Sequence, residues 1–455
     1  MLNTTLSLLR CPRLKTGSKN PAQRRQGPKS PQHKRSPCRG ALSLTSQKKV
    51  EIATSPDVFE VVSGHLECKV CRSRFPILAG IAILVDSVAN YLIDHAKGIA
   101  QAVSDSEIPA EYRKDFLQAK AQIQLEHIED DLEAERVVSL YIMNHYLQAN
   151  RSVKGQSRED GKGEGLEARS PWWKPRGAAG SASSEGPRRE GNPALQSGVA
   201  FPGSKLIDTL IREYWDQGPF AQIERWVSHQ KNVSKKSLNA VELGCGVGGL
   251  YPVLKNHLRS YLGVDSSFVS IAVARHLALG MPYRGSIRIP EDLLQGPVSR
   301  PVTFPSASSA FGPSRSSGVP AGSRSPLADG SSDFIVGDLE SLPLHSEQWD
   351  LTIALNAIDM MDDPSLLPQL QRELIKKDGI AIQSCPYIWH PGVAKRLRKK
   401  LPEGKRTSSS AAVEWLYEQA GFKIEERALD IPWLFFKHVR QLEIYSVHAF
   451  VSRKA

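Results

Sequence analysis

A short glycine-rich segment constrains the fold of this chain more than any other feature of its sequence. Residues 241–249 read Val-Glu-Leu-Gly-Cys-Gly-Val-Gly-Gly, overlap the end of a predicted strand at 240–243 and open a predicted helix. Glycines have no Cβ, so the backbone can turn tightly there and a ligand can lie against it. Such turns also bind dinucleotides, and some are ordinary strand-to-helix turns. The segment therefore predicts an α/β fold with a ligand site at this turn.

The rest of the C-terminal half alternates short β-rich runs with helical stretches. Further strands are predicted at 261–264, 334–336, 351–355 and 380–383, and helical periodicity also covers 88–150 and 205–230. Alternating strands and helices imply a doubly wound, mostly parallel sheet that binds ligands at the carboxyl ends of its strands.

Two acidic residues end the strands that follow the glycine turn. Asp265 lies 21 residues after Gly244, where a carboxylate can accept both hydroxyls of a ribose. Asp338 ends the next strand, where it could accept from an adenine amino group. The segment 297–331 lies between the two acids and is rich in Pro, Gly and Ser, so we expect a flexible loop there. Without that loop the acids are about one βα unit apart, as a shared crevice requires.

These motifs resemble class I S-adenosylmethionine-dependent methyltransferases over about residues 238–455. The matching segments are 242–248, Asp265, 337–343, 349–356, 370–379 and the late Gly-Phe turn within 420–424. A nicotinamide enzyme explains the glycine turn but not the Leu-Pro pair at 342–343 or the late turn. The resemblance implies a Rossmann-like fold, methyltransferase activity (a transferase carrying out methylation) and S-adenosyl-L-methionine as cofactor. It implies cofactor contacts from Glu242, Gly244, Cys245, Gly246, Gly248, Asp265, Ser266, Asp338, Leu339 and Asn356.

The methyl acceptor is less constrained by the sequence. Transfer from a sulfonium depends mainly on alignment, and a general base is needed only when the nucleophile arrives protonated. His390 is the candidate base and Tyr387 the candidate orienting phenol, although His390 also fits a solvated loop. Residues 356–364 lack an Asn-Pro-Pro-Tyr motif, which argues against amide and exocyclic-amine acceptors. The aromatic segment 431–438 predicts either a substrate lid or a patch that packs on the N-terminal domain.

Four of the six cysteines lie within the first 71 residues. Cys68 and Cys71 have the Cys-x-x-Cys spacing of a zinc knuckle. Deleting residues 14–37 would join Cys11-Pro-Arg to Cys38 and create a second knuckle. We therefore interpret 14–37 as an excursion from a zinc knuckle, or as a mis-spliced segment, and predict Cys11, Cys38, Cys68 and Cys71 as metal ligands. The alternative is four reduced structural thiols.

The sequence around these cysteines resembles the small zinc-ribbon-like subunit that activates tRNA, ribosomal-RNA and release-factor methyltransferases. The resemblance covers about residues 6–86 and includes Gly-x-Leu-x-Cys-x-x-Cys followed by Phe-Pro-Ile. Ala82 replaces a usual proline, and the first cysteine pair is split. The resemblance implies a metal-binding module with one structural zinc that packs on the methyltransferase domain in cis and shapes it.

We thus expect a small α+β zinc-ribbon-like module at 1–87, a helical connector at 88–150, a disordered insert at 151–203 and a methyltransferase domain at 204–455. The disordered inserts 14–37 and 297–331 would interrupt the first and last of these.

The positive charge of the chain is local. Residues 1–50 hold 12 Lys and Arg and no acid, and seven of these basic residues lie in 14–37. The remainder has 47 basic and 48 acidic residues, so the fold as a whole does not predict a polyanion-binding surface. A mitochondrial transit peptide is an alternative interpretation of the basic segment.

The sequence shows no apolar run of about 18 residues and no cysteine-dense scaffold, which predicts no membrane contact and a cytoplasmic, reducing location. A small-molecule acceptor is the first expectation. The alternatives are an RNA or protein methyltransferase and a non-catalytic cofactor-binding scaffold.

Overall fold

The computed structural model describes residues 1–14, 38–51, 57–125, 141, 218–277, 283–292, 296–304, 332–406, 408–438 and 441–455. The predicted insert at 151–203 lies outside these residues, as do most of 14–37 and of 297–331. The predicted helices at 88–150 and 205–230 fall within them only in part.

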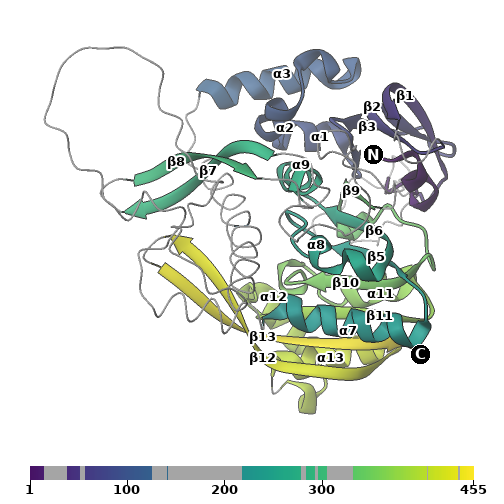
Figure 1. Ribbon diagram of the computed structural model, residues 1–455, viewed down its shortest axis with the longest axis vertical. Helices are drawn as coiled ribbons and strands as arrows, with labels where there is room; N and C mark the ends of the chain where they lie inside the picture. Colours follow the sequence, from purple (N-terminus) through teal and green to yellow (C-terminus); the bar gives the residue numbers. More distant parts are fainter. Residues whose placement is uncertain are drawn as a thin grey trace, which may run out of the picture.

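One mixed sheet runs through the described part of the molecule (Figure 1). Its eleven strands have the order β1-β2-β3-β4-β9-β6-β5-β10-β11-β13-β12. The strands are β1 (Leu42–Glu51), β2 (Phe59–Cys68), β3 (Arg74–Leu78), β4 (Ile81–Leu84), β5 (Leu238–Leu243), β6 (Leu258–Asp265), β9 (Ser332–Gly337), β10 (Trp349–Leu355), β11 (Ile375–Cys385), β12 (Phe422–His438) and β13 (Gln441–Lys454).

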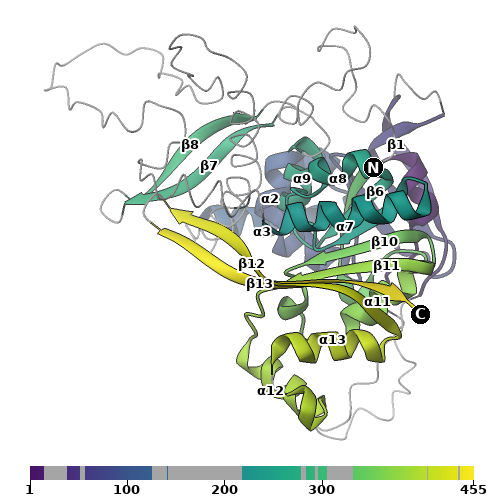
Figure 2. The same cartoon turned by 60° about the horizontal axis from the view of Figure 1, so that its bottom comes forward.

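Helices cover both faces of this sheet (Figure 2). On one side lie α7 (Pro219–Ser234), α8 (Tyr251–Leu254) and α9 (Phe268–Leu277), and on the other α11 (Leu366–Leu374), α12 (Pro391–Lys400) and α13 (Ser409–Gln419). Short 3-10 helices are η1 (Asn3–Leu8), η3 (Asp105–Glu107), η7 (Lys255–His257), η8 (Leu339–Ser341), η9 (Ile358–Met360) and η10 (Glu403–Lys405). This is the predicted Rossmann-like, doubly wound arrangement.

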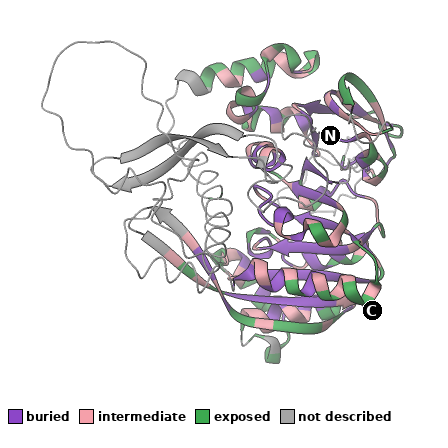
Figure 3. Ribbon diagram, viewed as in Figure 1, coloured by how far each residue is buried: buried purple, intermediate pink, exposed green. Residues whose placement is uncertain are grey.

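The five predicted strands of the C-terminal half are confirmed as β5, β6, β9, β10 and β11. They run parallel to one another and are buried along most of their length (Figure 3), because helices shield both faces. The strand order reverses at β5, which pairs with β6 on one side and β10 on the other. Beyond β11 the sheet ends with antiparallel β13 and then β12, unlike the sixth strand of a dinucleotide-binding sheet.

The N-terminal strands belong to the same sheet. Strands β1 to β4 form an antiparallel meander, and β4 then pairs in parallel with β9, with Ile83 opposite Val336 and Leu84 opposite Gly337. Because the two strands are parallel, the carboxyl ends of β4 and β9 lie side by side, and the chain leaves both strands on the same side of the molecule.

A buried ion cluster joins the same two regions. The Arg275 guanidinium of α9 donates to Asp333 on β9 and to Glu60 on β2, and Arg275 and Asp333 are each 2% exposed. The backbone N–H of Leu2 also donates to Asp333, at 2.8 Å. Removing one member of such a buried cluster leaves the other charges without compensation.

The predicted connector is helical where it is described. It forms α1 (Val88–Asp94), α2 (Ala96–Ala102) and α3 (Ala110–Leu125), whose buried side chains include Val88, Leu92, Ala96, Ile99 and Phe116. No helix in the described ranges has both the length and the apolar character needed to cross a bilayer.

One sequence expectation is wrong in part. The flexible loop predicted at 297–331 begins with an ordered strand, because β8 (Gly296–Phe304) pairs antiparallel with β7 (Tyr283–Asp292). Val298, Val302 and Phe304 have high β-propensity in the sequence, and the pairing supplies hydrogen-bond partners along one edge of each strand. The high Pro, Gly and Ser content of residues 297–331 as a whole masked the β-strand at the beginning of this segment.

Candidate functional site

A cavity of about 1040 Å³ opens at the carboxyl ends of β5, β6, β9 and β10. It lies at the point where the strand order reverses, which is where open α/β sheets bind ligands. Nine of the ten predicted cofactor residues line it: Glu242, Gly244, Cys245, Gly246, Asp265, Ser266, Asp338, Leu339 and Asn356.

The glycine turn forms the floor of this cavity. Gly246 has a φ of +52°, and a Cβ built on it would meet no atom within 4 Å, so the backbone at this residue faces open space. A side chain at Gly246 would fill part of the cavity. The turn thus provides a cradle of backbone that a ligand can approach closely.

Gly248 does not line the cavity, although the sequence predicted it as a cofactor contact. A Cβ on Gly248 would lie 2.9 Å from Phe334 and 3.0 Å from Ala274. Gly248 therefore allows the turn to pack against β9 and α9. This is a packing role, and motif spacing alone does not separate it from a ligand contact.

Asp265 links the end of β6 to the glycine turn. One carboxylate oxygen accepts the N–H of Gly246 at 2.9 Å, and the other accepts the N–H of Ser267 at 2.8 Å. Burial raises the pKa of the Asp265 carboxyl, while hydrogen bonds from backbone N–H groups oppose that rise. The carboxylate has about four acceptor positions, so two remain for a ligand.

Glu242 is the most buried acid of the cavity, with 3% of its surface exposed. Its carboxylate accepts the hydroxyl of Tyr261. Burial raises the pKa of Glu242 to about 8, although the Tyr261 hydrogen bond opposes this rise and nearby Asp265 adds to it.

Asp338 and Asn356 border the cavity from β9 and β10. The exposed Asp338 side chain accepts the N–H of Glu340 at 2.9 Å and so caps η8. Asn356 has a φ of +53°, and its Oδ1 is buried without a hydrogen-bond partner among the described residues. A buried acceptor at a cavity wall fits a ligand that brings a donor.

Neither candidate catalytic residue lines the cavity. His390 is exposed and caps α12, where its Nδ1 accepts the N–H of Gly392 at 3.2 Å. The Tyr387 hydroxyl lies 2.7 Å from Nδ1 of His448, and its ring stacks on Trp389 at 5.7 Å. The chain turns at Tyr387, which has a φ of +62°, and the Tyr387 hydroxyl meets His448, which pairs with Cys385 at the end of β11, rather than the cavity.

Several lining residues were not predicted from the sequence. One group comes from the connector and consists of Asp94, His95, Lys97, Gly98 and Gln101. Met360 and Met361 follow β10 and also line the cavity, and no motif in the sequence marks them. Trp433, from the predicted aromatic segment, borders the cavity beside Phe220 of α7, with ring centroids 5.7 Å apart.

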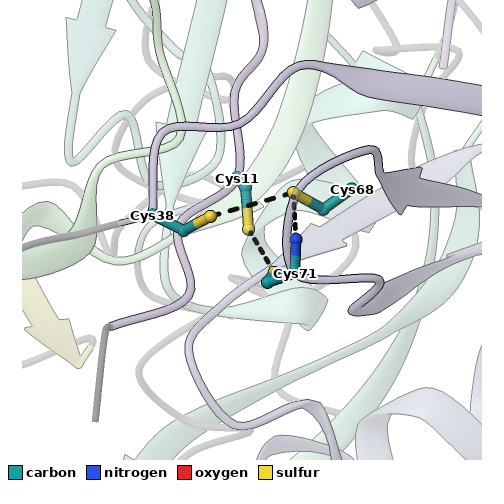
Figure 4. A group of neighbouring side chains, drawn as sticks. All are labelled: Cys11, Cys38, Cys68 and Cys71. Atoms are coloured by element: carbon teal, nitrogen blue, oxygen red, sulfur yellow. Dashed lines mark hydrogen bonds between the residues drawn. The ribbon is translucent and has the colours of Figure 1, made fainter. Parts of the chain in front are cut away.

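The four N-terminal cysteines lie together, as Figure 4 shows. Their sulfur atoms all lie within 4.8 Å of one another, with Cys11 to Cys71 at 3.5 Å and Cys38 to Cys68 at 3.9 Å. Zinc with Zn–S bonds of about 2.3 Å holds its tetrahedral sulfurs about 3.8 Å apart. The cluster is therefore compatible with a metal ion.

The chain on either side of the segment 14–37 is also brought together. The N–H of Cys38 donates to the carbonyl of Arg13 at 2.7 Å, and the N–H of Arg39 donates to that of Cys11 at 3.1 Å. The two halves of the split cysteine pair are thus adjacent.

Comparisons with known proteins found no matching family model and no matching curated protein. Among solved structures, magnesium protoporphyrin IX methyltransferase from Synechocystis with bound SAH matches at 16% identity and a TM-score of 0.31, over 56% of this chain and 89% of that one. A chain from a complex of the Trm112 methyltransferase activator of Haloferax volcanii matches at 15% identity and a TM-score of 0.28, over 51% and 90%. Because these TM-scores are low, the function proposed below rests on the motifs and the cavity.

Proposed function

We propose that this protein is an S-adenosylmethionine-dependent methyltransferase. The observation that carries the proposal is that nine residues predicted from methyltransferase motifs, spread between positions 242 and 356, line one cavity. These residues lie far apart in the sequence and come together because neighbouring parallel strands end at the same opening.

The residues present fit this cofactor. Asp265 has acceptor positions left for the ribose hydroxyls, and the bare backbone at Gly246 allows a ligand to lie against the turn. Asp338 is available to the adenine amino group, and the buried Oδ1 of Asn356 to a donor near the reacting end. When bound, the cofactor supplies a methyl group that is already activated, so these side chains bind and orient it.

A small molecule is the proposed acceptor. The cavity is at the upper end of the range of about 300–1,000 Å³ typical of small-molecule sites, which leaves room for a second small ligand beside the cofactor. Phe220, Trp433 and Met361 give the remaining space an apolar wall. Since neither His390 nor Tyr387 lines the cavity, we assign neither of them as a base.

For the N-terminal region we propose a zinc-ribbon-like module that holds one structural zinc on its four cysteines and stabilises the methyltransferase domain in cis. The sulfur distances support the metal, and the β4–β9 pairing and the Arg275 cluster support the role in cis. Backbone at Arg13 and Cys38 closes the split knuckle without the intervening segment.

A non-catalytic scaffold that binds the cofactor is the second candidate. It is favoured by one observation, the position of both candidate catalytic side chains outside the cavity. Such a protein would bind S-adenosylmethionine and methylate nothing.

The test is a transfer screen with S-adenosylmethionine labelled in its methyl group. The full chain is incubated with small-molecule, RNA and protein fractions, and Asp265→Ala is the negative control. We expect label in the small-molecule fraction with the wild type alone. Label in the RNA or protein fraction would show that the acceptor is a macromolecule and not a small molecule. Cofactor binding without any transfer would favour the non-catalytic scaffold.

A further inference from the structure

One wall of the cavity is built by a part of the chain that lies outside the Rossmann-like region. We call it the connector wall; it consists of the lining residues Asp94, His95, Lys97, Gly98 and Gln101. These residues come from the end of α1 and from α2. The motifs that predict the cofactor site all lie more than a hundred residues further along the chain.

The sheet topology explains this position. Strand β4 runs parallel to β9, so the segments that follow these two strands leave the sheet on the same side, at the carboxyl ends of the strands. After β9 the chain passes directly into Asp338 and Leu339, which line the cavity. After β4 it passes into α1 and α2, which must therefore pack beside the same opening.

Two contacts fix α1 and α2, the helices that carry the connector wall, to the segment after β6. The hydroxyl of Tyr91 on α1 donates to the carbonyl oxygen of Ser266 at 2.7 Å, one residue after Asp265. On α2, a Cβ built on Gly98 would lie only 2.3 Å from Cγ2 of Val269 on α9. The backbone of α2 therefore lies directly against Val269, and only glycine allows this approach.

The wall is also firmly packed. Val88 and Leu92 of α1 and Ala96 and Ile99 of α2 are almost completely buried, at 5% exposure or less. Helices held by buried side chains on one face keep a fixed position, so the other face presents a defined surface to the cavity.

We propose that α1 and α2 form the wall that encloses the adenosine end of the bound cofactor, and that Tyr91 and Gly98 are positioning residues that set cofactor affinity. The adenosine end is assigned because both contacts fall on the segment next to Asp265, the proposed ribose ligand. The inference rests on the proposed function, since it needs the cofactor in this cavity.

The experiment is a compensating pair of substitutions in the full chain, with S-adenosylhomocysteine binding measured by calorimetry. Gly98→Ala places a Cβ against Val269, whose β-branched side chain has little rotamer freedom in a helix. We expect the affinity to fall by about tenfold as α2 is displaced. Val269→Ala removes the clashing atom, and the next atom is 3.8 Å away, so the double variant should return close to the wild-type affinity.

Two further variants separate this role from general stability. Gly404→Ala is the matched control, because a Cβ there meets nothing within 4 Å, and it should bind as the wild type does. Tyr91→Phe removes only the hydrogen bond to Ser266, and we expect a loss of about threefold. Thermal unfolding of each variant is recorded beside its affinity.

The outcomes distinguish a failure of the proposed role of α1 and α2 from a failure of the proposed function. Wild-type affinity in both Gly98→Ala and Tyr91→Phe, with weakened binding in Asp265→Ala, would overturn the proposed role of α1 and α2 and leave the proposed function in place. A loss in Gly98→Ala that Val269→Ala does not restore would also overturn it. A wild type that binds neither S-adenosylhomocysteine nor S-adenosylmethionine would overturn both.

Discussion

At the scale of single residues, Glu242 is a buried acid on a central strand of the sheet. It lies in the middle of the sheet at the ligand edge, and burial raises the pKa of its carboxyl to about 8. A carboxyl with this pKa is mostly protonated at neutral pH, and so it donates as well as accepts hydrogen bonds.

This property predicts a pH dependence of stability. Because the folded pKa of Glu242 lies above the unfolded value, the folded state holds one more proton between about pH 4.5 and pH 8. Its contribution to stability is therefore fully present below that window and is lost as the pH rises through it. Glu242→Gln cannot ionise, so the variant should differ little from the wild type at pH 5 and should unfold at a clearly higher temperature than the wild type at pH 8.5.

Thermal unfolding of the ligand-free proteins at these two values checks the prediction, with Glu403→Gln on exposed η10 as the control. An equal difference between Glu242→Gln and the wild type at both values would contradict the assignment of the pH effect to Glu242.

The sequence predicted the acids and glycines of the cavity because each of them sits at a fixed place relative to a strand end. Asp265 ends β6 and Asp338 directly follows β9, so both lie at the carboxyl ends of neighbouring parallel strands. His390 and Tyr387 also follow a strand, but their direction depends on a backbone turn at Tyr387 and on a partner, His448, that is distant in sequence. The local sequence pattern predicts neither the backbone turn nor the contact with His448.

At the scale of elements, the cysteine cluster joins two chain segments into one knuckle pair. The hydrogen bond from Cys38 to Arg13 shows that the segment 14–37 begins and ends at one point. That closure was predictable from the spacing of the cysteines. The position of α2 was not, because it follows from the pairing of β4 with β9, which involves residues about 250 positions apart and has no motif.

If zinc occupies the cluster, the loss of a single cysteine ligand should be enough to abolish zinc binding. We expect about one zinc per chain in the purified wild type and close to none in Cys68→Ala, with a clear fall in unfolding temperature, because a structural site contributes folding free energy. Metal content by mass spectrometry checks this. Cys385→Ala is the matched control, since Cys68 and Cys385 are both fully buried, and it should lose stability but keep zinc. Equal zinc in Cys68→Ala and wild type would contradict the site.

At the scale of the whole molecule, the N-terminal strands and the Rossmann-like region share one sheet. Deleting residues 1–87 would expose the edge of β9 and remove Glu60 from the buried Arg275 cluster. Exposed sheet edges promote aggregation, and a buried charge without its partner destabilises the fold. We expect the soluble yield to fall several-fold.

Deleting residues 14–37 is the matched control, because Arg13 and Cys38 already lie in contact. Soluble yield and unfolding temperature of that variant should stay close to those of the wild type. A full yield of the protein lacking 1–87 would contradict the proposed role in cis.

The central claim is that Asp265 binds the ribose of S-adenosylmethionine, and calorimetric titration of the full chain tests it most directly. Asp265→Ala removes charge-assisted hydrogen bonds, so its affinity for S-adenosylmethionine should fall by about ten- to a hundredfold. Asp115→Ala, an exposed acid on α3, serves as the control and should bind as the wild type does. Equal affinities in all three proteins, or no binding by the wild type, would contradict the account.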